Sequence, residues 1–171
     1  LLIIVLLINA LVFYEEFLSP IEPSAENESP IINDNLAGKK ESYLTGELVD
    51  EDVTATVSVA AMIDNLSSAR PAAGLNSAAL VFETLVEGGV TRIMGVWQTK
   101  EDITIGPIRS ARHYFLPWAE ELRATYVHSG GNQRGLAAIK NSDLLYGADE
   151  FKNGGSYYRI NSLPAPHDLF T

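Results

Sequence analysis

The chain has 171 residues, no cysteine and a formal net charge of −10. This length suffices for one domain with a hydrophobic core, and the lack of cysteine excludes disulfides, thiolate catalysis and cysteine metal ligands. The acidity is uneven, since residues 15–52 carry −9 and residues 53–171 only −1, so the body has no basic surplus for binding nucleic acid.

The first segment, residues 1–18, opens with the apolar run "LLIIVLLINALVF". The run is shorter than the roughly 20 residues that span a bilayer. Because the sequence starts inside the run, we expect upstream residues to complete it and the chain to be a fragment cut at both ends. We predict a truncated transmembrane signal anchor or an uncleaved signal peptide, with the membrane as its partner.

The charge that follows this segment predicts the orientation of the chain. The first basic residue is Lys39, so the flank lacks the positive charge that retains a segment in the cytoplasm. We therefore expect a single-pass or signal-anchored protein of the cell membrane, with its body on the extracytoplasmic side.

Residues 19–52 are rich in Ser, Pro, Glu and Asn, with few aliphatic side chains. Such a composition buries too little apolar surface to offset the entropy of ordering. We predict a disordered acidic linker here and a folded domain over 53–171, truncated at its C-terminus.

Within the folded domain, strand and helix patterns alternate. Alternation predicts a strand within 53–65 and a hairpin over 79–99 around Gly88-Gly89, while 132–141 reads as a helix. A second helix is predicted from about Ser110, and a short strand within 124–131. The expected fold is a single α+β domain with a mixed β-sheet that is flanked by helices.

The hairpin carries a possible charged cluster. If Gly88-Gly89 forms a two-residue turn, Glu83 lies opposite Met94, and Arg92 lies diagonally between Glu83 and Glu87 on one face. Two interpretations stay open: an internal salt-bridge cluster, or a polar floor beneath a ligand cleft.

Two arginines flank a predicted helix start in "IGPIRSARHYF". The first turn of a helix favours negative charge, so Arg109 and Arg112 need a partner there. With Ser110 as N-cap, they would form a site for a carboxylate or phosphate. Alternatively, internal acids neutralise them, the candidates being Asp64, Glu83 and Glu87.

The histidines offer weaker candidates. His128 precedes a Gly-Gly turn, and His167 lies in "PAPHD", where either could act as a general base. No paired-histidine metal motif and no dinucleotide or phosphate loop is present, so we expect neither a metal nor a cofactor.

Several motifs together indicate a family. "MIDN", "VFETLVEGGVTR", "IGPIRSAR", "YVHSGG" and "APHDLF" occur in this order, and from about Val59 onward the chain resembles the N-terminal domain of the YerB-like bacterial lipoproteins. The resemblance implies an exported, envelope-associated protein with a smaller second domain downstream. It implies no settled activity, and the lipid-modified cysteine typical of the family is missing here.

These observations give three functional hypotheses. The leading one is an extracytoplasmic module that binds an anionic envelope ligand such as a peptidoglycan fragment. Its candidate residues are Asp64, Glu83, Glu87, Arg92, Arg109, Ser110, Arg112, His128 and His167. One alternative is an envelope-polymer hydrolase that uses Glu83 or Glu87 with His128, and another is a protein-interaction scaffold.

Overall fold

The computed structural model describes residues 37–152, 159–160 and 169–170. The predicted membrane segment at 1–18, the first half of the predicted linker and His167 lie outside these residues. Within the described part of the chain, no helix is both long and apolar enough to cross a membrane.

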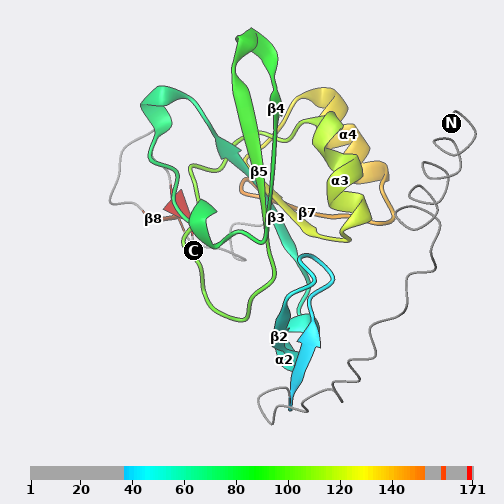
Figure 1. Ribbon diagram of the computed structural model, residues 1–171. Helices are drawn as coiled ribbons and strands as arrows, with labels where there is room; N and C mark the ends of the chain where they lie inside the picture. Colours follow the sequence, from blue (N-terminus) through cyan, green and yellow to red (C-terminus); the bar gives the residue numbers. More distant parts are fainter. Residues whose placement is uncertain (1–36, 153–158, 161–168, 171) are drawn as a thin grey trace, which may run out of the picture. The chain divides into compact units, whose positions relative to one another are not determined.

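A five-stranded mixed sheet forms the centre of the described domain (Figure 1). Its strands, in spatial order, are β4 (Leu80–Leu85), β5 (Thr91–Trp97), β3 (Val59–Asp64), β6 (Thr125–His128) and β7 (Tyr146–Asp149). β4, β5 and β3 pair antiparallel, whereas β3, β6 and β7 pair parallel. This confirms the predicted α+β class with a mixed sheet.

Ordered structure begins before the predicted domain start at residue 53. A small antiparallel sheet is formed by β1 (Lys39–Glu41) and β2 (Leu48–Asp50), and helix α2 (Glu51–Thr54) follows it. Ion pairing between Lys39 and Asp50 joins the two strands, and Leu44 of their connection is buried in the core. The acidic composition of this segment predicted disorder, but the charged side chains face solvent and so do not prevent the backbone from forming these elements.

Two helices cover one face of the main sheet. α3 (Leu116–Glu121) and α4 (Gln133–Asn141) both contribute side chains to the core cluster that contains Met62 and Met94. α4 confirms the helix predicted at 132–141, and the Asn132 side chain caps it by accepting a hydrogen bond from the Gly135 amide. The remaining described elements are four 3₁₀ turns, η3 (Ser67–Ala69), η4 (Leu75–Ser77), η5 (Glu87–Gly89) and η6 (His113–Phe115), and strands β8 (Arg159–Ile160) and β9 (Leu169–Phe170).

The helix predicted from Ser110 is wrong at its start. Residues 105–112 are extended, and helical structure begins only at His113. Ile108 forms a bridge to Ile63 of β3, and Ala111 forms one to Gly131. Burial of these apolar side chains in the core outweighs the local helix-start signal.

The two faces of the main sheet have separate cores. Beneath the helices lie Met62, Met94 and Tyr126, whereas Ile63 and Trp97 belong to the opposite cluster. β4 follows the same alternation: Leu80 and Phe82 are partly buried against the helix-side core, and Val81, Glu83 and Leu85 are exposed. β4 thus has a partly buried apolar side and an exposed side that carries Glu83.

The predicted register of the β4–β5 hairpin is wrong by one residue. Thr84 lies opposite Arg92, and Glu83 lies opposite Ile93 rather than Met94. The cause is a three-residue connection, Glu87–Gly89, closed by a hydrogen bond from the Val86 amide to the Val90 carbonyl. The shift moves Arg92 to the helix-side face, away from Glu83, because side chains alternate along a strand.

Candidate functional site

Five of the predicted residues gather at one end of β3 and β5. We term this set the arginine cluster; its members are Asp64, Glu87, Arg92, Arg109 and Arg112. Asp64 and Arg92 are direct cross-strand partners. The extended segment 105–112 supplies the other two arginines, and the hairpin connection supplies the glutamate. These five residues therefore lie together, although the local structure differs from the one that was predicted.

Asp64 and Arg109 form a largely buried ion pair. Arg109 Nε lies 2.7 Å from Asp64 Oδ2, and the aspartate side chain is only 4% exposed. The other carboxylate oxygen accepts a hydrogen bond from the Leu66 amide, and Arg109 Nη1 also donates to the Ile108 carbonyl. These contacts compensate the cost of burying the carboxylate, which matches the internal-partner alternative for Arg109.

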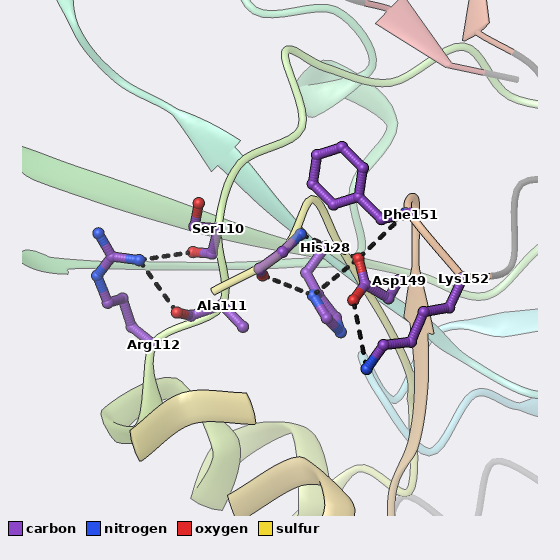
Figure 2. A network of polar contacts seen from close by, with 8 residues as sticks. Ser110, Ala111, Arg112, His128, Asp149, Phe151 and Lys152 are labelled. Atoms are coloured by element: carbon purple, nitrogen blue, oxygen red, sulfur yellow. Dashed lines mark hydrogen bonds and ion pairs between the residues drawn. The ribbon is translucent and has the colours of Figure 1, made fainter. Parts of the chain in front are cut away.

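Arg112 pairs with Glu87 at the edge of the cluster. Its Nε lies 2.8 Å from Glu87 Oε2, and its Nη1 donates to the carbonyl oxygens of Ser110 and Ala111 (Figure 2). The hydrogen bond from Arg112 lowers the pKa of the Glu87 carboxyl. Ser110 therefore contributes its backbone oxygen to the site, not the side-chain N-cap that was predicted.

Arg92 is the arginine that lacks a close carboxylate. Its Nη1 donates to the Ser110 carbonyl at 3.2 Å, while its Nε is buried without a hydrogen-bond partner among the residues that the structure describes. No ion pair within 4.0 Å joins it to any described residue. Burial lowers the pKa of the Arg92 guanidinium, and the charge of Arg112 lowers it further.

Two tyrosines border the cluster. The hydroxyls of Tyr114 and Tyr126 are buried, and both lie close to Arg112, whose side chain acts on Tyr114 and whose backbone acts on Tyr126 to lower the pKa against the larger effect of burial. Burial raises the pKa of both hydroxyls, so both are protonated at neutral pH, and the charges of Arg112 and Arg92 act on each of them. The arginine cluster thus contains three guanidinium groups and two carboxylates, and the phenol groups of the two tyrosines lie next to it.

Glu83 is separate from the cluster. It lies on the exposed face of β4, where Asn65 and Thr91 donate hydrogen bonds to its carboxylate. Arg70 holds this arrangement in turn, because its Nε donates to the Asn65 side-chain oxygen. Glu83 therefore belongs to a surface hydrogen-bond network and not to the predicted cleft floor.

His128 ends β6 and is 98% buried, with an exposed fraction of only 2%. Its Nδ1 lies 2.8 Å from the Gly130 carbonyl oxygen and 4.0 Å from Asp149 Oδ1. No hydrogen bond or ion pair between described residues joins His128 to either glutamate that the hydrolase hypothesis requires. The residues of that hypothesis therefore do not form one catalytic group.

Sequence reasoning missed Tyr114, Tyr126 and Asp149. Tyr126 could have been found, because it is two residues before His128 in a short strand and so lies on the same face. Nothing local marks Tyr114 or Asp149. Within the described ranges, no three His, Asp or Glu side chains come together in a group that could hold a metal ion.

Comparisons with known proteins agree with the fold and the motifs. Residues 44–171 match the family described as "Protein of unknown function (DUF3048) N-terminal domain". The chain is 32% identical over 137 residues to the Bacillus subtilis (strain 168) protein named "Putative lipoprotein YerB", which covers 79% of this chain and 41% of that protein.

A solved structure gives the same result. The crystal structure of the YerB protein from Bacillus subtilis matches with a TM-score of 0.68 at 31% identity, over 78% of this chain and 46% of that one. The chain spans less than half the length of these two relatives. This chain belongs to the DUF3048 family, as the resemblance of its motifs to YerB-like proteins indicated.

Proposed function

We propose that this chain is a membrane-anchored domain of the cell envelope that binds an anionic ligand through the arginine cluster. The name of the relative, a lipoprotein, supports attachment at the envelope. The observation that carries the binding proposal is Arg92, a partly buried guanidinium whose Nε has no partner.

Charge and hydrogen bonding favour an anion at this position. Two of the three arginines have a carboxylate within 3 Å, and Arg92 has only the Ser110 carbonyl. A partly buried guanidinium that no carboxylate contacts is unfavourable, even with the charge of Asp64 nearby, and a carboxylate or phosphate that accepts from it would relieve this cost. The Tyr114 and Tyr126 hydroxyls supply two further donors beside it.

The expected ligand class is a peptidoglycan fragment. Such fragments carry free carboxylates on their peptide stems, and the proposed envelope location exposes the domain to them. A carboxylate also matches the forked geometry of the guanidinium better than a neutral sugar does. The ligand's carboxylate should therefore contribute most of the binding free energy.

Retention of cell-wall fragments tests this proposal. Purified chain is incubated with a muropeptide mixture, and the bound and soluble species are identified by mass spectrometry. We expect the wild type to retain muropeptides, Arg92→Met to lose them, and Arg123→Gln to retain them, since Arg123 is exposed at the end of α3.

A chemical control tests whether binding depends on the negative charge of the muropeptide carboxylates. Muropeptides whose carboxylates are all converted to amides should not be retained by the wild type. Equal retention of the amidated mixture, or equal retention by Arg92→Met, would contradict the proposal. New soluble cleavage products made by the wild type would instead support the hydrolase alternative.

A further inference from the structure

A hollow lies between α4 and the ends of β6 and β7. Its volume is about 440 Å³, within the range of small-molecule sites. The residues that shape its chemistry are His128, Asp149, Ile139, Lys140, Gly147 and Lys152. It opens at the carboxyl ends of two parallel strands, the edge at which sheets of this kind bind ligands.

The protonation of His128 follows from its hydrogen bond. Because a carbonyl oxygen only accepts, His128 Nδ1 must donate its proton to the Gly130 oxygen. In the neutral ring, Nε2 then carries a lone pair and accepts hydrogen bonds. Nε2 faces Gly147 of the hollow, where an added Cβ would lie 3.5 Å from it.

The environment keeps this ring neutral. Burial lowers the pKa of His128, although the Gly130 carbonyl and the charge of Asp149 oppose part of the shift. Asp149 itself accepts hydrogen bonds from the amides of Gly130 and Phe151 (Figure 2). It therefore holds the loop that fixes His128, and its Oδ1 lies 4.0 Å from the ring's Nδ1.

The mouth of the hollow is cationic. Lys152 Nζ lies 3.9 Å from Asp149 Oδ2 with its side chain 74% exposed. Lys140, in the last turn of α4, is also exposed. Two ammonium groups against one carboxylate leave a net single positive charge. Leu136 and Ile139 of α4 add an apolar wall.

We propose that this hollow is a second binding site, for a small N-acylated amino acid or a similar monocarboxylate. The carboxylate lies between Lys140 and Lys152, the amide N–H donates to His128 Nε2, and an apolar side chain packs on Leu136 and Ile139. The site shares no side chain with the five residues of the arginine cluster, although the Tyr126 ring, which borders that cluster, lies 5.6 Å from the His128 ring.

Nuclear magnetic resonance of the histidine ring nitrogens tests the site, with N-acetyl-leucine as the probe. We expect the ¹⁵N resonance of His128 Nε2 to move on titration as it accepts a hydrogen bond, while Nδ1 keeps its proton. N-acetyl-leucinamide, which lacks the carboxylate, should bind about tenfold more weakly. A His128 spectrum unchanged by N-acetyl-leucine, or equal affinities for the two probes, would overturn the proposal.

Variants of the two lysines of the hollow test where the carboxylate of N-acetyl-leucine binds. Lys140→Gln and Lys152→Gln, both at exposed positions that should not disturb folding, should each weaken N-acetyl-leucine binding at least about threefold. Lys40→Gln, an exposed lysine of β1, is the matched control and should bind as the wild type does. Arg92→Met should also bind this probe normally, so failure of one site is distinguishable from failure of the other. Losses no larger than that of Lys40→Gln would contradict the assignment.

Discussion

Replacing Arg92 with methionine tests whether this guanidinium serves binding and not folding. Methionine keeps an unbranched apolar stem of similar length and removes the charge. No carboxylate loses its ion-pair partner, because the carboxylates of the cluster are bonded to Arg109 and Arg112. The Ser110 carbonyl still accepts from Arg112 Nη1, so the substitution leaves no backbone acceptor unpaired.

The expected change in stability is therefore small. The variant loses one hydrogen bond from a charged donor, worth about 1.5–3 kcal/mol. It also loses the repulsion from Arg112 and Arg109 and the cost of partly burying a guanidinium that no carboxylate contacts, and these effects act in the opposite direction. The free energy of unfolding of Arg92→Met should lie within about 1 kcal/mol of the wild type.

Urea unfolding followed by far-ultraviolet circular dichroism measures this difference. The slope of free energy against urea should be the same for both proteins, because the exposed surface on unfolding is unchanged. A loss greater than about 2 kcal/mol would show that Arg92 stabilises the fold. The interpretation of these residues as an internal salt-bridge cluster would then be favoured over their interpretation as a binding site.

Three further predictions concern stability. Asp64→Ala should cost about 3 kcal/mol in urea unfolding because it removes the buried carboxylate that pairs with the Arg109 guanidinium, whereas Asp50→Ala, in an exposed pair, should cost under about 1 kcal/mol. Gly95→Ala should cost about 1–3 kcal/mol and change the near-ultraviolet dichroism, because its Cβ would clash with the Trp97 ring. The pKa of His128 in the folded chain lies below its ordinary value of 6.5. Unfolded chains therefore bind a proton at a higher pH than folded chains do, and the free energy of unfolding should fall as pH drops from 6.5 toward the lower pKa. Replacing His128 with glutamine should flatten this slope, and an unchanged slope would show that another group titrates.

Much of the fold was predictable where local pattern and tertiary packing agree. The alternation in β4 identified its buried and exposed sides, and Asn132 marked the start of α4 correctly. The register of the hairpin was not predictable from Gly88-Gly89 alone, since connections of two and three residues use the same glycines. A single added loop residue was enough to separate Glu83 from Arg92.

The candidate site was also predictable only in part. Asp64 and Arg109 were named as possible partners from their charges, and the structure pairs them. The segment before His113 was predicted as a helix start because Ser110 is a good N-cap, but long-range pairing with β3 keeps it extended. Alternation along its strand places Tyr126 on the same face as His128, but its position beside the arginines depends on strand pairing between distant segments, which local sequence patterns do not specify.

The central claim is that Arg92 binds an anion. Isothermal titration calorimetry with a purified muropeptide that carries a free carboxylate tests this most directly, on the wild type and on Arg92→Met. We expect measurable binding to the wild type and at least about tenfold weaker binding to the variant, a difference of about 1.4 kcal/mol, with the two folds equally stable. Equal affinity of the two proteins for the muropeptide would contradict the claim.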